Sequence, residues 1–178
     1  FHEGVLQGKN IREGQQIDCV DEMVNPYKEF DHFLKLAENE NLTFVFSNTT
    51  EAGITLDNEE QFTARPAHSF PGKLTQLLYH RFKTFNGDKS KVLHIIPCEL
   101  IDKNGTKLKE IILELCEIWK LDNNFISWIH LNHFYNTLVD RIVPGFPKKD
   151  LNFYKKQLPF DDKLIVTCEP FFLWVIEG

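Results

Sequence analysis

The sequence predicts an α/β fold with a largely parallel sheet and flanking helices. Short apolar strands rich in β-branched residues alternate with amphipathic helices, which is the pattern of β-α-β crossovers. The segment 42–48 is apolar on both faces toward its middle, as expected where a parallel strand is covered on both sides. Crossovers in such a sheet are right-handed, and ligands bind at the carboxyl ends of its strands.

The first quarter of the chain has the pattern of one β-α-β unit. Strands are expected at 15–20 and 42–48. Between them Asn25-Pro26 begins a helix, because proline is favoured in the first turn and apolar residues follow at roughly helical spacing. These apolar residues are Phe30, Phe33, Leu34 and Leu36. The polar segment 55–68 is expected to be a surface loop.

Two longer helices and a strand are expected next. Ser69-Phe70-Pro71-Gly72 begins a helix that ends at the turn Asn86-Gly87-Asp88, and a short buried strand follows at 92–97. Asn104-Gly105-Thr106 then provides the cap of the clearest helix in the sequence. Its apolar residues repeat at i, i+3, i+4 and i+7, and they are Leu108, Ile111, Ile112, Leu115 and Ile118.

The last third is less regular. A helix is expected from Asp122-Asn123-Asn124, followed by an extended stretch at 138–143 that stops at Pro144-Gly145. A short helix near 148–157 precedes a final strand at 163–168 and an aromatic run at 170–175.

Composition excludes several classes of protein. The 178 residues carry 20 basic and 26 acidic side chains, for a formal net charge of −6, and 42% are hydrophobic. A general nucleic-acid binder would need clustered Lys and Arg, and a disordered chain would be less apolar. No run reaches the roughly 18 apolar residues of a membrane helix. The sequence therefore predicts a globular protein that binds neither nucleic acid nor membrane.

The cysteines indicate a reducing compartment. Cys19, Cys98, Cys116 and Cys168 lie far apart, form no C-x-x-C pair, and sit in or beside apolar runs. We expect buried reduced thiols rather than disulfides or a metal site, and hence a cytoplasmic protein.

Polar residues follow three of the expected strands, in the loops 48–53, 98–106 and 168–172. Asn48-Thr49-Thr50-Glu51 places an amide, two hydroxyls and a carboxylate where a ligand would lie, although a solvated turn uses the same residues as caps. Cys98-Glu99 and Cys168-Glu169 each place a carboxylate after a strand, where it could act as a general acid or base.

Two further patterns leave alternatives open. Asp140-Arg141 interrupts an apolar stretch, and is either a buried ion pair or a functional pair. His130 and His133 could share a metal ion on a helix, but no matching carboxylate and histidine set is near, which favours surface or capping histidines.

The sequence contains neither G-x-G-x-x-G nor a P-loop, and so no phosphate cradle of those types.

Several strings together resemble the mannitol dehydrogenase family of polyol-specific long-chain dehydrogenases. The resemblance covers nearly the whole chain from about residue 5, and the V-D-R-I-x-P string is its most specific part. The strings are 47–54, 69–74, 97–101, 136–144 and 168–171.

The resemblance implies an NAD(H)-linked enzyme without a metal. The strings are most similar to the branch that interconverts D-tagaturonate and D-altronate in galacturonate breakdown. Fructuronate reduction and hexitol or hexitol phosphate oxidation are the alternatives within the family. A non-catalytic α/β module that binds a partner or a sugar through the aromatic run 170–174 is the alternative outside it.

The resemblance also implies a domain arrangement. The family has a Rossmann-type N-terminal domain with a Gly-rich first turn, followed by a mostly helical domain whose lysine acts as the base. Neither piece lies in this sequence. We therefore expect 1–178 to be the later part of the Rossmann-type domain, without its first βαβ unit and inactive alone.

Site residues follow from the matched strings. Asp140 matches the aspartate that contacts the polyol chain, with Arg141 supporting it and supplying positive charge for a uronate. Asn48, Thr50 and Glu51 match the loop on the nicotinamide side of the cleft, and Glu169 matches the carboxylate opposite that loop. Leu100 stands where mannitol-type members have an asparagine that holds the reacting oxygen. This difference disfavours a mannitol enzyme.

Overall fold

The computed structural model describes residues 1–177 and divides into two compact units, each considered by itself. The terminal unit consists of Phe1–Asp21 and Val139–Trp174. The sheet unit consists of Glu22–Leu138 and the chain from Val175 on. No helix in the described part of the chain is long and apolar enough to cross a membrane.

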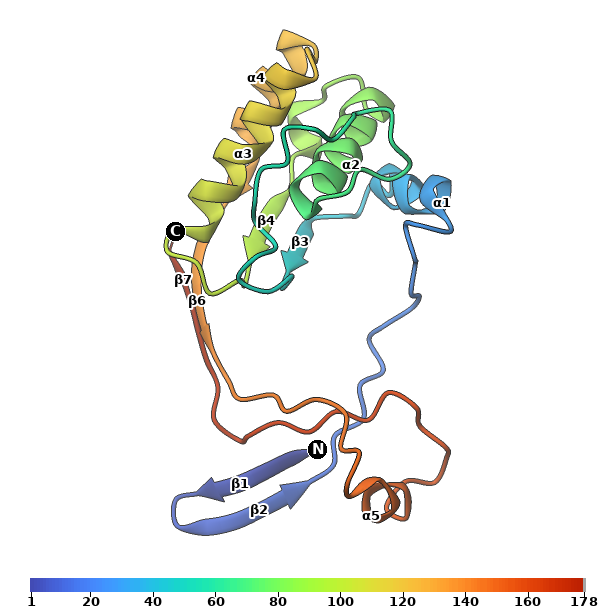
Figure 1. The fold of residues 1–178 in the computed structure, drawn as a ribbon, viewed down its shortest axis with the longest axis vertical. Helices are drawn as coiled ribbons and strands as arrows, with labels where there is room; N and C mark the ends of the chain where they lie inside the picture. Colours follow the sequence, from blue (N-terminus) through green and yellow to red (C-terminus); the bar gives the residue numbers. More distant parts are fainter. Residues whose placement is uncertain (178) are drawn as a thin grey trace. The chain divides into compact units, whose positions relative to one another are not determined.

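The sheet unit is built on a parallel three-stranded sheet. Its strands are β3 (Phe44–Ser47), β4 (His94–Pro97) and β5 (His133–Phe134), in the order β3-β4-β5. Ser47 is in register with Pro97, so β3 and β4 end at the same edge, and Figure 1 shows the two arrows pointing the same way. The predicted parallel sheet is confirmed, and the predicted strand at 92–97 begins two residues later than expected.

Four α-helices belong to the described part of this unit: α1 (Phe30–Lys35), α2 (Phe70–Thr84), α3 (Asn104–Ile118) and α4 (Asn123–Leu131). The short 3-10 helices η1 (Leu36–Glu38) and η2 (Lys89–Lys91) precede β3 and β4. Ser69 caps α2 by accepting a hydrogen bond from the Gly72 amide at 2.9 Å, as its place before Phe70-Pro71 predicts. Asp122 caps α4 through the Asn124 amide at 2.7 Å.

The cap predicted for α3 is wrong in detail. Asn104 is the first residue of the helix, and the N-cap is Lys103, which has a φ of 51° and no side-chain capping bond. Asn136 takes over the capping role, because its Oδ1 accepts the Thr106 amide at 2.9 Å. The Asn104 side chain is thereby left to bond elsewhere.

One face of the sheet forms the hydrophobic core with the helices. Val45, Ile95 and Phe134 face this core, and α2 and α3 pack on each other and on the sheet (Figure 1). The helical residues of the core lie at the spacings predicted from sequence, except that Ile118, the last residue of the predicted repeat in α3, is 39% exposed. The fully buried ones are Leu78, Leu108, Ile112, Leu115, Cys116, Phe125 and Ile129.

The other face of β3 is open in this structure. Phe44 is 51% exposed, which contradicts the expectation that this strand is buried on both sides. Its ring lies 5.3 Å from that of His94, which in turn stacks on His133 at 4.8 Å. This exposed face of β3 is therefore aromatic rather than aliphatic. A run of apolar residues in the sequence does not show whether such a face is exposed or belongs to the core.

A buried arginine fixes the amino ends of β3 and β4. Arg81 of α2 is 1% exposed and lies against no carboxylate among the described residues. Its guanidinium donates to four main-chain carbonyls instead, and burial lowers its pKa from the ordinary value. The acceptors are the carbonyls of Ala37, Asn39, Leu42 and Lys91, at 2.7–3.1 Å.

The predicted strand at 15–20 is wrong, and with it the β-α-β unit that it would begin. Residues 14–21 have no regular structure, and Ile17 and Val20 are 65% and 62% exposed. Their alternating apolar pattern suits a strand, but no other strand of the described chain pairs with them.

The terminal unit contains a hairpin and a short helix. Strands β1 (His2–Leu6) and β2 (Lys9–Glu13) pair antiparallel, and α5 is Leu151–Lys155. The Phe1 ring lies 4.7 Å from that of Tyr154, and the Arg12 guanidinium lies 4.2 Å from the Phe153 ring centre, so α5 packs on the hairpin. The hairpin was not predicted.

The last strands differ from those expected. The stretch predicted as a strand at 163–168 forms only isolated bridges, at Thr167 and Cys168. Strand β6 (Asn136–Asp140) pairs instead with β7 (Leu173–Glu177), which contains the second half of the aromatic run 170–175. All four cysteines are free thiols. Cys116 is buried as predicted and Cys98 and Cys168 are partly buried, but Cys19 is exposed because it lies in the irregular segment 14–21.

Candidate functional site

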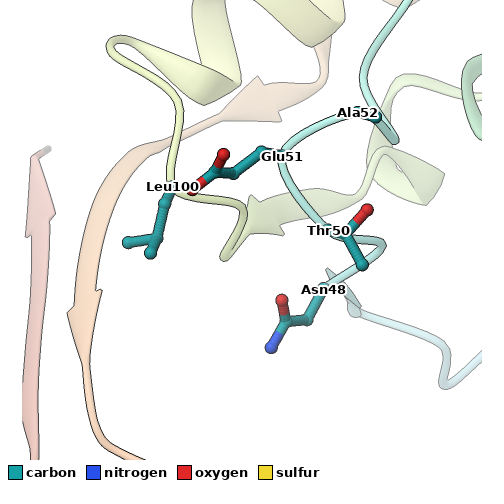
Figure 2. Close-up of a pocket in the computed structure, with 5 residues that line it drawn as sticks. All are labelled: Asn48, Thr50, Glu51, Ala52 and Leu100. Atoms are coloured by element: carbon teal, nitrogen blue, oxygen red, sulfur yellow. The ribbon is translucent and has the colours of Figure 1, made fainter.

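The candidate site is a pocket at the carboxyl ends of β3 and β4. It has a volume of about 430 Å³. Asn48, Thr50, Glu51 and Ala52 follow β3, and Leu100 comes from the segment after β4. Figure 2 shows the Glu51 side chain extending from its loop toward the segment that carries Leu100. The loop predicted from sequence thus lines a pocket at the edge of a parallel sheet where ligands bind.

The backbone of this loop is strained at Thr50. Its φ is 77°, in the left-handed region that β-branched residues rarely adopt. The Gly53 amide donates to the Thr50 carbonyl at 3.0 Å and closes a tight turn. Gly53 also lies so close to Thr49 that a Cβ there would be 1.8 Å from the Thr49 Oγ1. Strain of this kind is found where a loop is held for function.

The two residues that follow β4 do not supply an acid, a base or a nucleophile to this pocket. Glu99, a candidate from sequence, is 2% exposed and accepts hydrogen bonds from Ser47 and Thr49. Burial raises the pKa of the Cys98 thiol, and the neighbouring Glu99 charge raises it further, so the thiol stays protonated. Both residues therefore support the loop rather than react with a ligand.

Asn104 joins the segments beneath the pocket and is fully buried. Its Nδ2 lies within hydrogen-bond distance of the carbonyls of Pro97 (3.1 Å), Glu99 (3.0 Å) and Thr137 (3.2 Å). Its Oδ1 accepts the Thr137 amide at 2.9 Å. The end of β4, the start of α3 and β6 are thereby held at one point.

The remaining predicted site residues lie in the terminal unit. Glu169 Oε1 accepts the Ile142 amide at 2.6 Å. Arg141 donates through Nε and Nη2 to the Glu169 carbonyl, at 3.2 and 3.1 Å, and its Nη2 lies 2.9 Å from Nδ1 of His2. The Asp140 side chain is exposed and makes no hydrogen bond or ion pair within residues 1–177. Arg141 and Glu169 are brought together in this unit, and Asp140 is left open to solvent.

The buried ion pair considered for Asp140 and Arg141 is excluded. Both side chains are exposed, and no salt bridge joins them. The neighbouring Ile142 and Val143 are 64% and 52% exposed, so the apolar stretch around the pair is not a core strand.

The two histidines considered for metal binding are on different elements. His130 lies on α4, whereas His133 belongs to β5 and stacks on His94. In the part of the chain that the structure describes, no three His, Cys, Asp or Glu side chains converge on one point. Ala52 is the pocket residue that the sequence did not single out, although it lies inside the predicted loop 48–53.

Comparison with known families decides which family this is. Residues 6–178 match the mannitol dehydrogenase Rossmann domain. The chain belongs to the mannitol dehydrogenase family. The resemblance seen in the sequence is thereby confirmed, and so is the Rossmann-type fold class.

Relatives within the mannitol dehydrogenase family are similar over the whole chain. An altronate oxidoreductase of Bacteroides thetaiotaomicron is 52% identical over 177 residues, or 99% of this chain and 37% of the relative. One from Bacillus subtilis is 44% identical over 179 residues, again with 37% of the relative covered. The chain thus spans little more than a third of the length of these curated relatives.

Solved structures support the same fold. Mannitol 2-dehydrogenase of Pseudomonas fluorescens, in a ternary complex with NAD and D-mannitol, has a TM-score of 0.71 at 20% identity. The match covers 89% of this chain and 34% of that one. A D-sorbitol dehydrogenase in substrate-free form has a TM-score of 0.69 at 21% identity, with 84% and 32% covered.

Proposed function

We propose that this chain forms the later part of the Rossmann-type domain of an NAD(H)-dependent oxidoreductase that interconverts D-tagaturonate and D-altronate. The observation that carries this proposal is the 52% identity to an altronate oxidoreductase over 99% of the chain. Residues 1–178 would then contribute the cofactor side of the site and part of the substrate side. The base would come from another segment of the full-length protein.

The pocket after β3 and β4 fits the nicotinamide end of NAD(H). Asn48, Thr50 and Glu51 offer an amide, a hydroxyl and a carboxylate for the polar groups of the ring, and Leu100, 59% exposed, offers apolar surface for its face. A volume of about 430 Å³ lies within the range of small-molecule pockets. When bound, the nicotinamide supplies or accepts the hydride. The chain's own residues would fix the ring and exclude water from it.

The polar groups of the terminal unit would serve the substrate. Asp140 is an exposed carboxylate that can accept hydrogen bonds from sugar hydroxyls. Arg141 is held by Nε and Nη2, and its Nη1 makes no hydrogen bond among residues 1–177, so this group can pair with a uronate carboxylate. Glu169 keeps the main chain at Ile142 in place, which positions both of these side chains.

The test uses the full-length product of the gene that encodes this chain. The loss of NADH absorbance is followed with D-tagaturonate and with D-fructuronate, and NAD reduction is followed with hexitols and hexitol phosphates. We expect kcat/KM for D-tagaturonate to exceed that for D-fructuronate at least about tenfold. A preference for another sugar would replace the substrate and keep the NAD-linked reaction. No turnover with any of these substrates would overturn the proposal.

A matched pair of variants tests the substrate side. Asp140→Asn removes the carboxylate charge, and we expect kcat/KM for the uronate to fall about tenfold or more. Asp161→Asn is the control in the same unit, because Asp161 only makes an exposed ion pair with Lys155. Equal activity of the two variants would remove Asp140 from the site.

A further inference from the structure

One buried carboxylate holds the start of the loop that lines the pocket, on both sides of Asn48. Glu99 Oε2 accepts the Ser47 hydroxyl at 3.0 Å. Its Oε1 accepts both the Thr49 amide at 2.9 Å and the Thr49 hydroxyl at 2.7 Å. Ser47 is the last residue of β3, and Thr49 is the second residue of the loop, so the bonds enclose Asn48.

The three hydrogen bonds that reach Glu99 suit an acceptor-only group. An ionised carboxylate accepts at both oxygens and donates nothing, which suits two hydroxyls and one amide. The residue is 2% exposed, so water does not replace a lost bond easily. A carboxamide at this position would keep one acceptor oxygen, and the Ser47 hydroxyl would have to turn and accept from its NH₂ group. The site is thus built for a carboxylate.

The position of Thr49 is transmitted to the rest of the pocket wall. Gly53 packs so closely against Thr49 that a Cβ on it would lie 1.8 Å from Oγ1 and 2.7 Å from the Thr49 carbonyl oxygen. The turn between Thr50 and Gly53 therefore rests on Thr49. On the other side, Leu100 follows Glu99 directly and lines the same pocket.

We propose that Glu99 is a positioning residue, which holds the loop 48–52 and Leu100 in the arrangement that receives the nicotinamide end of NAD(H). This inference rests on the proposed function. Glu99 does not touch the ligand, and it acts through Ser47 and Thr49. Its loss displaces the pocket wall, and hydride transfer depends steeply on such displacements.

The sheet unit offers a matched control. Glu60 is also a buried glutamate, 7% exposed, and it accepts the Ser69 amide at 2.9 Å and the Ser69 hydroxyl at 2.7 Å. It holds the start of α2 and does not line the pocket. Glu60→Gln thus removes the same kind of interaction from a place where only stability should change.

The experiment compares Glu99→Gln with Glu60→Gln in the full-length protein. Two quantities are measured: amide hydrogen exchange of peptides covering 48–53, and the single-turnover rate of NADH oxidation with saturating D-tagaturonate. We expect Glu99→Gln to raise exchange at 48–53 and to slow the single turnover about tenfold to a hundredfold. We expect Glu60→Gln to leave both unchanged, whatever its unfolding midpoint.

A second variant keeps the test decisive if Glu99→Gln does not fold. Thr49→Val removes one of the three bonds with little change in shape, and we expect it to slow the turnover roughly threefold, while Thr49→Ser restores it. The Glu99→Gln, Thr49→Val double variant should be no slower than Glu99→Gln alone, because both changes break one network.

The outcomes separate this inference from the proposed function. A wild-type protein that does not oxidise NADH with D-tagaturonate contradicts the proposed function. An active wild-type protein whose Glu99→Gln variant turns over at the wild-type rate contradicts the positioning role. Equal losses in Glu99→Gln and Glu60→Gln also contradict it, because they would reduce Glu99 to a general stabilising residue.

Discussion

The side chain of Asn104 and the main chain of Thr137 hydrogen-bond to each other in both directions. Oδ1 accepts the Thr137 amide at 2.9 Å, and Nδ2 lies 3.2 Å from the Thr137 carbonyl oxygen. An amide side chain thus pairs with the start of β6 much as a neighbouring strand would.

Asn104→Ala should therefore be costly, since it leaves buried amide and carbonyl groups without partners. We expect a loss of about 2–4 kcal/mol in the free energy of unfolding. Urea unfolding followed by fluorescence measures it. Asn124→Ala, on the exposed side of α4, is the control and should change stability by less than about 0.5 kcal/mol. Similar midpoints for the two variants would contradict this account.

Gly105→Ala separates helix propensity from close packing. Alanine is the better helix former by about 1 kcal/mol, so propensity alone predicts a more stable protein. A Cβ at Gly105 would lie 2.2 Å from the Tyr135 carbonyl oxygen, however. We expect destabilisation by about 1–3 kcal/mol, measured against Lys107→Ala on the exposed part of the same helix. A gain in stability would show that the two segments are not in contact in solution.

Thr50→Asn should exchange activity for stability. Asparagine tolerates the left-handed region better than threonine does, and φ at Thr50 is 77°. We expect a gain of about 0.5–1 kcal/mol in the free energy of unfolding and a higher KM for NADH. Thr55→Asn is the control, because Thr55 is an exposed loop residue that is not among those with positive φ. A loss of stability in Thr50→Asn alone would mean that no strain is stored at this residue.

Cys116 should resist alkylation while Cys19 reacts. Burial raises the pKa of the Cys116 thiol from its ordinary value of 9.0 to about 12, whereas Cys19 is exposed. At pH 8 only about one Cys116 thiol in 10⁴ is a thiolate. Mass spectrometry after treatment with iodoacetamide should find the label on Cys19 in the native protein and on both residues in urea.

The raised pKa of the Cys116 thiol also determines the direction in which protein stability changes with pH. Folding favours the protonated Cys116 thiol, so its contribution to stability is complete below pH 9 and is lost as the pH rises toward 12. Unfolding midpoints measured between pH 8 and pH 11 should therefore fall, and they should fall less in Cys116→Ala. Identical slopes for the two proteins would contradict the assignment.

Local sequence patterns were enough to predict the helices that begin at a capping residue or contain a regular apolar repeat. Ser69 and Asp122 cap α2 and α4 as expected, and α3 follows its apolar repeat. The strand expected at 15–20 failed because alternation indicates only that one face is apolar. Whether a partner strand exists is a property of the tertiary structure. The exposed ring of Phe44 has the same explanation.

The candidate site likewise has a part that could be predicted from local sequence and a part that depends on tertiary contacts. The loop at Asn48 could be predicted because polar residues directly follow a strand. The role of Glu99 could not, because its partners Ser47 and Thr49 lie 52 and 50 residues away along the chain. Sequence reasoning placed its carboxylate at the correct edge of the sheet and considered it as a general acid or base, whereas the structure buries it against Ser47 and Thr49.

The hydrogen bonds of Arg81 restrict the length of the chain segment that contains β3. Its guanidinium fixes the carbonyl of Leu42, while Glu99 fixes the hydroxyl of Ser47, so the five steps between them are tied at both ends. Insertion or deletion of one residue in this interval would turn every following side chain of β3 to the opposite face. Homologous proteins should therefore keep the 42–47 interval constant in length.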